Sequence, residues 1–162
     1  MGIIMKPKNI IFDLGHVIFD YDPAIVRDLI KTAPEKTFNI IESGLQLLKK
    51  CHAQIDSNGK RRHKLFVLSN ATHNSFQVMT NYFPQIFELF DEVMTSAHVG
   101  MSKPDARIYY HFLQTHQLNP TDCIFIDDKE PNVLAARAVG MHSILCDNFD
   151  NVEQELQQLE VI

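Results

Sequence analysis

Five short apolar runs recur along the chain, and each ends in polar or turn-forming residues. The runs cover residues 10–12, 64–69, 92–95, 123–126 and 142–146. Apolar runs of this length, bounded by turn residues, are typical of strands that are buried on both faces. The pattern therefore predicts five buried strands.

Segments with apolar residues at helical spacing, or with a proline at the first helical position, separate these runs. They predict an extended flap over 17–22 and helices over 23–31, 36–54, 74–82, 105–116 and 131–140, with a closing amphipathic helix around 152–159. Strands that alternate with helices imply parallel pairing through right-handed crossovers. We expect an α/β fold with a doubly wound, Rossmann-like sheet of five parallel strands.

Polar residues follow the predicted strands at their carboxyl ends. They are Asp13, the pair Ser69 and Asn70, Lys103 within a loop over 96–104, and the pair Asp127 and Asp128. An isolated aspartate after a strand most often caps a turn. In a parallel sheet, however, the carboxyl ends of the strands open on one edge, where ligands bind. We therefore expect these groups to share one crevice.

The residue types in this crevice suit a phosphorylated ligand and a metal ion. Carboxylates from two different strands form a hard-oxygen site of the kind that Mg²⁺ prefers. The Ser69 hydroxyl and the backbone N–H groups beside it can hold phosphate oxygens, and Lys103 adds a positive charge. Each feature alone is a weak signal, and their order along the chain makes the combination specific.

Composition narrows the classes of function. A chain of 162 residues with 45% hydrophobic content has the bulk of a single domain, 1–162. Its formal net charge of −5 argues against a general nucleic-acid binder. No apolar run is long enough to cross a bilayer, and no signal-peptide pattern opens the chain. Three widely spaced cysteines fit a reducing compartment, so we expect a cytoplasmic protein without a membrane partner.

A basic run over 60–64 precedes the second strand and should lie at the end of the sheet opposite the crevice. Charge runs usually face water. A solvated loop is the favoured interpretation, and a partner-binding patch is the alternative.

The order and spacing of these segments resemble the haloacid dehalogenase superfamily. The resemblance is carried by Ile10–Gly15, Phe66–Asn70, Lys103 and Ile126–Asp128, and it covers nearly the whole chain. It is closest to the branch similar to α-D-glucose-1-phosphate phosphatase, because Gly100–Tyr109 reads Gly-Met-Ser-Lys-Pro-Asp-Ala-Arg-Ile-Tyr. Most members are Mg²⁺-dependent phosphatases that work through a phospho-aspartate, which implies a phosphorylated substrate, either a small molecule or a bulkier one.

By this resemblance, Asp13 is the catalytic nucleophile and a Mg²⁺ ligand. The other implied metal ligands are the backbone carbonyl of Gly15 and the carboxylate of Asp128. Ser69 and Asn70 are implied to hold the transferred phosphoryl group.

Lys103 is the second implied catalytic residue, steadying the phosphoryl group and the Asp13 carboxylate. Three roles stay open for Asp127: support of Lys103, support of a metal-bound water, or acceptance of hydrogen bonds at the start of the next helix. Asn132 stands where many relatives carry another acidic residue. We interpret Asn132 as an exposed residue in the first turn of that helix.

The chain departs from the family pattern at Gly15, where most members carry a second aspartate that protonates the leaving group and then activates water. General acid–base catalysis contributes about 10² to 10⁴ in rate. We therefore expect slowed catalysis, less so for leaving groups that need little protonation, and a faster Gly15→Asp variant. His16, Asp20 or Asp22 could replace the missing acid, although a turn histidine could equally face solvent.

The second departure is the cap. Relatives of this branch insert a helical cap between the first two motifs, whereas here only residues 21–36 are available, which predicts a vestigial cap or flap. A crevice without a lid excludes water poorly. A bulky substrate that covers itself, a homodimer partner that acts as the lid, or lost catalysis would each follow.

Two functions from different classes remain. The favoured one is a Mg²⁺-dependent phosphatase in which Asp13 attacks phosphorus and the aspartyl-phosphate is then hydrolysed. The alternative is a catalytically impaired regulatory domain that keeps the phosphate and metal pocket. Dehalogenase chemistry is a weaker third, because it needs no metal.

Overall fold

A parallel sheet of five strands forms the centre of the protein. The computed structural model describes residues 8–162, so residues 1–7 of the predicted domain lie outside the described part. The strand order is β5-β4-β1-β6-β7. The bounds are β1 Asn9–Phe12, β4 Lys64–Ser69, β5 Glu92–Thr95, β6 Cys123–Asp127 and β7 His142–Leu145. All neighbouring pairs are parallel, which confirms the predicted doubly wound α/β sheet.

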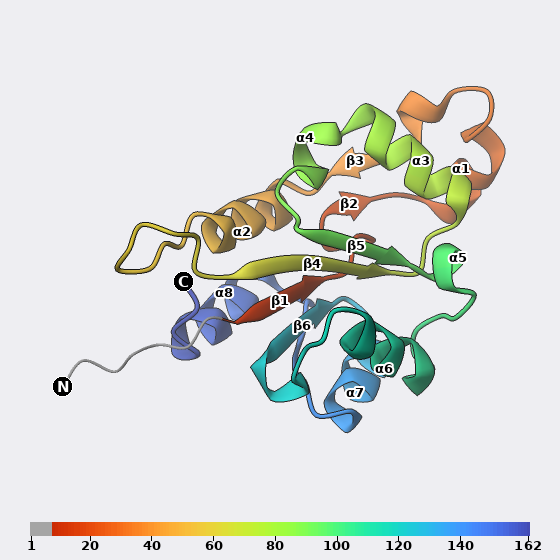
Figure 1. The fold of residues 1–162 in the computed structure, drawn as a ribbon. Helices are drawn as coiled ribbons and strands as arrows, with labels where there is room; N and C mark the ends of the chain where they lie inside the picture. Colours follow the sequence, from red (N-terminus) through yellow and green to blue (C-terminus); the bar gives the residue numbers. More distant parts are fainter. Residues whose placement is uncertain (1–7) are drawn as a thin grey trace.

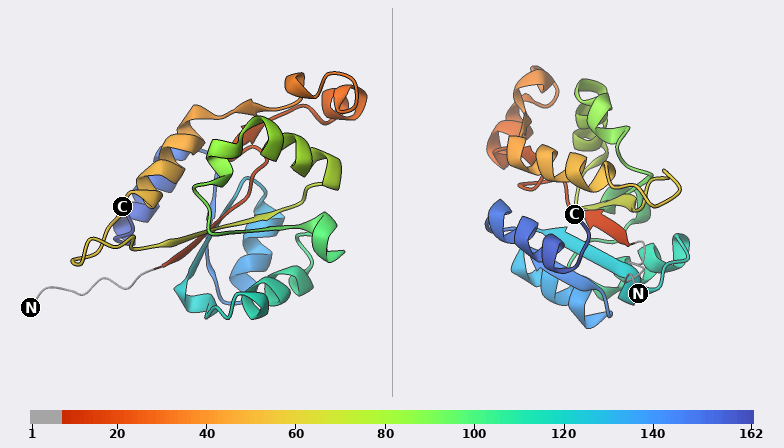
Figure 2. Two further views of the ribbon diagram at one scale, coloured as in Figure 1. Left: turned by 45° about the horizontal axis from the view of Figure 1, so that its top comes forward. Right: turned by 90° about the vertical axis from the view of Figure 1, so that its left-hand side faces the viewer.

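Helices cover both faces of this sheet (Figures 1 and 2). One face carries α2 Glu42–His52, α3 His73–Tyr82, α4 Pro84–Phe87 and α8 Phe149–Gln158. The other carries α6 Ala106–Thr115 and α7 Glu130–Ala138. A single helical turn, α5 Ser96–Val99, stands where a loop over 96–104 was predicted. Within residues 8–162, no helix is long and apolar enough to span a membrane.

The central strands are buried on both faces. In β1, Ile10 and Phe12 pack on the side of α2, and Ile11 packs on the side of α6. The same alternation recurs in β4 and β6. Because such strands offer no polar position inside the sheet, polar side chains appear where the strands end. The strand order reverses at β1, between β4 and β6, so this end of β1 is where a ligand crevice is expected.

A small two-stranded ribbon and a short helix lie beside α3 (Figure 1). β2 (Phe19–Asp20) pairs antiparallel with β3 (Asn39–Ile40), and residues 21–36 between them contain α1 (Pro23–Leu29) and the 3₁₀ turn η1 (Pro34–Lys36). Helix α2 closes on the base of this ribbon at Gly44, where a Cβ would lie 1.8 Å from the Val17 carbonyl oxygen. A residue without a Cβ is therefore required at Gly44.

The predicted helix over 36–54 was wrong at its start, since α2 begins only at Glu42. Residues 39–40 pair with β2 instead of continuing a helix. This pairing buries the Phe38 ring against Phe19, with ring centroids 6.4 Å apart. The apolar residues before Glu42 recur at helical spacing, but burial against the rest of the protein favours an extended conformation there.

The basic run over 60–64 lies at the amino end of β4, as predicted. Its lysines and Arg61 are exposed, but His63 is 1% exposed, which corrects the prediction of a fully solvated loop. The His63 Nδ1 accepts a hydrogen bond from the Lys8 N–H at 3.0 Å, and its Nε2 lies 3.0 Å from the Val161 carbonyl oxygen. Burial is the main cause that lowers the pKa of His63.

Because the pKa of His63 is lowered on folding, protonation favours the unfolded chain. Stability from this residue is therefore present above the unfolded pKa, near 6.5, and is lost as the pH falls through the folded pKa, at up to about 1.4 kcal/mol per pH unit. Between pH 7.5 and pH 5.0, the free energy of unfolding measured by urea denaturation should fall less for His63→Gln than for the wild type. The partly exposed His142 provides the control, and an equal loss in His63→Gln and His142→Gln would contradict the prediction.

Candidate active site

A small hollow at the carboxyl ends of β1, β4 and β6 brings the predicted site residues together. Its volume is about 20 Å³, and that is the size of one water molecule or one ion. Its lining includes these residues that the sequence analysis assigns to the site: Asp13, Gly15, His16, Ser69, Asn70, Lys103 and Asp128. Tyr21, Lys129 and Asn132 complete the wall.

Asp13 is the first residue after β1 and is 6% exposed. Its backbone N–H donates to the Ile126 carbonyl at 2.9 Å, which extends the pairing with β6 and fixes where the carboxylate begins. The Asp13 Oδ1 lies 3.0 Å from the Lys103 Nζ. This contact is an ion pair without hydrogen-bond geometry, so Oδ1 keeps an unused acceptor position. The buried Asp13 carboxylate therefore faces the hollow.

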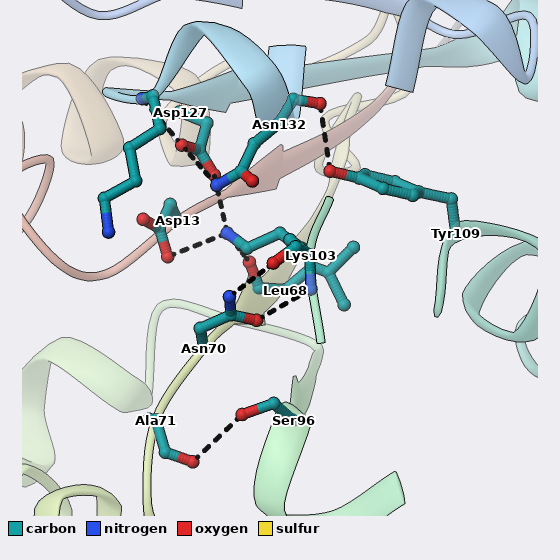
Figure 3. A network of polar contacts seen from close by, with 10 residues as sticks. Asp13, Leu68, Asn70, Ala71, Ser96, Lys103, Tyr109, Asp127 and Asn132 are labelled. Atoms are coloured by element: carbon teal, nitrogen blue, oxygen red, sulfur yellow. Dashed lines mark hydrogen bonds and ion pairs between the residues drawn. The ribbon is translucent and has the colours of Figure 1, made fainter. Parts of the chain in front are cut away.

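Lys103 is 4% exposed and its ammonium group is held from three sides (Figure 3). Nζ donates to the Leu68 carbonyl at 2.8 Å and to the Asp127 Oδ2 at 2.5 Å, besides the contact with Asp13. The ammonium also lies 5.2 Å from the centroid of the Phe125 ring. These contacts fix a positive charge beside Asp13.

The side-chain amide of Asn70 is engaged by the backbone of Lys103, and the implied role of Asn70 in holding phosphate stays a prediction. Its Nδ2 donates to the Lys103 carbonyl at 2.8 Å, and its Oδ1 accepts from the Lys103 N–H at 2.9 Å. Both polar ends of the amide therefore hold the segment that carries Lys103. The hydroxyl of the buried Ser69 and the backbone N–H groups beside it are left as the groups that can meet a phosphate.

Asp127 is 0% exposed and its carboxylate is fully engaged. It accepts from Lys103 and also, through Oδ1, from the Lys129 N–H at 2.9 Å at the start of α7. Of the three open roles, these contacts agree with two: support of Lys103 and acceptance of a hydrogen bond at the start of the next helix. Burial raises the pKa of Asp127, and the Lys103 charge acts against that rise.

The interpretation of Asn132 as an exposed residue was wrong, because Asn132 is 4% exposed. Its Nδ2 donates to both carboxylate oxygens of Asp127 at 3.0 Å. Its backbone carbonyl accepts a hydrogen bond from the Tyr109 hydroxyl at 2.9 Å (Figure 3). The only signal in the sequence is its place five residues after Asp127. That spacing puts it on the inner side of the first turn of α7.

The oxygen atoms in the hollow fit a divalent cation. One oxygen from each of Asp13, Asp127 and Asp128 lies within 4.8 Å of the others. Asp13 Oδ1 and Asp128 Oδ1 are buried acceptors without a hydrogen-bond partner, whereas Asp127 is engaged. Burial raises the pKa of Asp128, and the negative charge of Asp13 adds to the rise. A bound cation would relieve this repulsion, and Gly15 lies on the same wall.

Tyr21 occupies the space beside Gly15 that a side chain would need. A Cβ built on Gly15 would lie 3.0 Å from both Cε1 and Oη of Tyr21. The ring is held by stacking on His16, with centroids 4.8 Å apart, and by contact with Phe38 at 5.5 Å. Burial raises the pKa of Tyr21, and the charges of nearby carboxylates add to the rise. Sequence reasoning missed Tyr21, because only the fold brings the flap over Gly15.

The candidate substitutes for the missing acid lie in different places. His16 lines the hollow, and its Nδ1 lies 3.3 Å from the Asp20 Oδ1, whose side chain is 68% exposed. Asp22 caps α1 by accepting from the Ala24 N–H at 2.7 Å. Of the three, His16 alone lines the hollow, and its role as an acid stays a prediction.

Comparison with known proteins identifies the family of this chain. The profile of the haloacid dehalogenase-like hydrolases matches residues 29–146. A sesquiterpene phosphatase of Aspergillus oryzae is 28% identical, covering 94% of this chain and 96% of the relative. That alignment runs over 188 positions, so the relative has residues that this chain lacks. A drimenol cyclase of Aspergillus calidoustus is 33% identical over 71% of this chain, but the matched part is 20% of its length.

Solved structures show the same fold. A haloacid dehalogenase family enzyme of Bacteroides thetaiotaomicron, crystallised with magnesium and inorganic phosphate, superimposes with a TM-score of 0.72 at 17% identity, covering 90% of this chain and 98% of that one. An uncharacterised protein of Listeria monocytogenes superimposes with a TM-score of 0.71 at 18% identity, covering 96% and 99%. At these identities the likeness concerns the fold.

Removing the Asn132 amide should destabilise the protein, because the Asp127 carboxylate would lose two hydrogen bonds inside the core. We expect Asn132→Ala to lower the free energy of unfolding by about 1–3 kcal/mol, measured by urea denaturation. Asn151→Ala on the exposed side of α8 is the matched control and should change it little. An equal free energy of unfolding for the two variants would show that the Asn132 contacts do not stabilise the protein.

Proposed function

The chain belongs to the haloacid dehalogenase-like hydrolases, and we propose that it hydrolyses phosphate monoesters in a Mg²⁺-dependent reaction that passes through an aspartyl-phosphate on Asp13. The observation that carries this proposal is the buried Asp13 carboxylate, with an unused acceptor oxygen and the Lys103 ammonium 3.0 Å away. The relative named as a sesquiterpene phosphatase supports a phosphatase-type hydrolase. The likeness to the glucose-1-phosphate phosphatase branch stays a prediction.

In the proposed reaction, an Asp13 carboxylate oxygen attacks phosphorus and the bond from phosphorus to the ester oxygen breaks. The leaving alkoxide takes a proton from solvent water, and a water molecule then attacks the aspartyl-phosphate and gives up a proton to solvent, which releases inorganic phosphate and restores the carboxylate. The Ser69 hydroxyl and the backbone N–H groups beside it hold the phosphoryl oxygens. Lys103 neutralises the charge that Asp13 and the phosphoryl group share.

Asp13, Asp128 and the Gly15 carbonyl are the proposed Mg²⁺ ligands. The two orphaned carboxylate oxygens are the observation that favours this set. When bound, Mg²⁺ would offset the negative charge that builds up between the carboxylates and the phosphoryl group. A structural neighbour crystallised with magnesium and phosphate supports the same chemistry for this fold.

Gly15 supplies no acid for the leaving alcohol, so the proposed reaction runs slowly with alkyl esters. We also propose that residues 21–36 are what remains of a cap on a single domain. A homodimer partner that covers the crevice would complete such a site. The cytoplasmic location and the absence of nucleic-acid partners stay predictions.

A second candidate is a regulatory domain that binds phosphate and metal without turnover. The observation that favours it is Tyr21, which fills the space where family members carry the second aspartate. Under this alternative the site keeps its ligands but releases no phosphate. The next experiment separates the two.

Asp13→Asn should lower phosphate release from a panel of phosphate monoesters by at least about 10³-fold, because the nucleophile is lost. Release by the wild type should also stop when EDTA removes Mg²⁺ and return when Mg²⁺ is restored. Equal release by wild type and Asp13→Asn would refute the nucleophile assignment. Binding of Mg²⁺ and phosphate by a wild type that releases nothing would favour the regulatory domain.

Gly15→Asp alone should not deliver the increase expected from the sequence, because the Tyr21 ring stands 3.0 Å from the new Cβ. In Gly15→Asp/Tyr21→Ala the carboxylate has room, and turnover of alkyl phosphates should exceed that of Gly15→Asn/Tyr21→Ala by about 10²-fold. Steady-state kinetics with a phenyl and an alkyl phosphate would measure this. If Gly15→Asp alone raises turnover as much as the double variant, Tyr21 is not the obstacle.

A further inference from the structure

A larger cavity adjoins the small hollow. Its volume is about 400 Å³, and it lies between α1 and α3, which Figures 1 and 2 show side by side. The two spaces share Gly15, Tyr21, Ser69 and Asn70 in their walls. An ester whose phosphoryl group lies at Asp13 would therefore extend its alcohol part into this cavity.

The side chains that face this cavity are mainly apolar. Val26 of α1 and Ile30, the residue that caps the end of this helix, are one turn apart and half-buried, and α1 has no fully buried residue. On the opposite wall, Met79 of α3 is 4% exposed, and Phe38 is equally buried. The apolar side of α1 is thus turned toward a space that the described residues leave open.

Several polar groups of the wall are already paired, and Tyr21, Ser69 and Asn74 are further polar residues of the wall. Thr72 caps α3 by accepting from the Ser75 N–H at 3.1 Å, and its hydroxyl donates to the Ser75 hydroxyl at 2.9 Å. The Asn70 amide holds the Lys103 backbone. Arg27 pairs with Asp28 at 3.1 Å, and its side chain is 74% exposed. A sugar would need several converging hydrogen-bond partners, and a second anionic group would need an unpaired cation.

We propose that this cavity binds the apolar part of the substrate, so that the substrate class is phosphate monoesters of apolar alcohols. The inference rests on the proposed phosphatase function and names the substrate of the same site. At about 30 Å³ for each non-hydrogen atom, as for liquid water, the cavity has room for roughly a dozen atoms. An alcohol of about ten carbons would fill it.

A series of n-alkyl phosphates tests the proposal. The probes are methyl, butyl and decyl phosphate with Mg²⁺, below the micelle concentration of the decyl ester. Calorimetry on Asp13→Asn gives dissociation constants without turnover, and phosphate release by the wild type gives kcat/KM. Affinity and kcat/KM should rise with chain length, by up to about fourfold for each methylene that is buried.

A matched pair of α1 variants locates the effect. Val26 lines the cavity, whereas its neighbour Ile25 is 44% exposed and lies outside it. In the Asp13→Asn background, Val26→Asn should lower the ratio of decyl to methyl affinity by about three- to tenfold. Ile25→Asn, which makes the same polar change on the same helix, should leave that ratio unchanged.

The outcomes separate this proposal from the proposed function. Hydrolysis of all three esters with equal affinity for methyl and decyl phosphate would overturn the apolar pocket and keep the phosphatase. Chain-dependent binding without hydrolysis would keep the pocket and overturn the phosphatase. If Ile25→Asn and Val26→Asn lower the ratio of decyl to methyl affinity equally, the alkyl group binds elsewhere and the proposal is overturned.

Discussion

The buried charge of Lys103 is the constraint on which the edge of the sheet depends. An ammonium group that is 1% exposed is strongly destabilising unless anions and hydrogen-bond acceptors surround it. Those partners come from the ends of three adjacent strands: Asp13 after β1, Leu68 in β4 and Asp127 in β6. A shift of any of these strand ends would leave a charge unpaired in the core. The pairing that stabilises the fold therefore also sets the geometry of the proposed nucleophile.

Two sides of the molecule contribute different parts of the site. On the side of α6 and α7, the Tyr109 hydroxyl donates to the backbone carbonyl of Asn132, and the side-chain amide of Asn132 donates to the Asp127 carboxylate. That chain of hydrogen bonds is buried and keeps charged groups in place. On the other side, α1 and α3 enclose an apolar space that contributes no charge to the reaction. The buried charges and most of the apolar cavity thus come from different sides of the sheet, and Gly15, Tyr21, Ser69 and Asn70 belong to both spaces.

The sequence predicts the strands and the polar residues at their ends, because both follow from local pattern and from one rule of parallel sheets. It does not predict that Asn132 is buried or that Asn70 binds the Lys103 backbone. Those facts depend on which segments, far apart in the chain, meet at the crevice. Tyr21 is the clearest case: nothing in the spacing of the flap shows that its ring lies against Gly15.

The position of the Tyr21 ring depends on the absence of a side chain at Gly15. An aspartate at Gly15 would require the Tyr21 ring to shift, because the Cβ would already lie 3.0 Å from the ring. The ring forms part of both the small hollow and the apolar cavity. On the proposed function, the site has an aromatic ring with a hydroxyl group beside the position where a carboxylic acid is missing. On the same proposal, the loss of the acid lowers the rate constant for an alkyl leaving group, whereas the ring adds apolar surface that an alkyl group can contact.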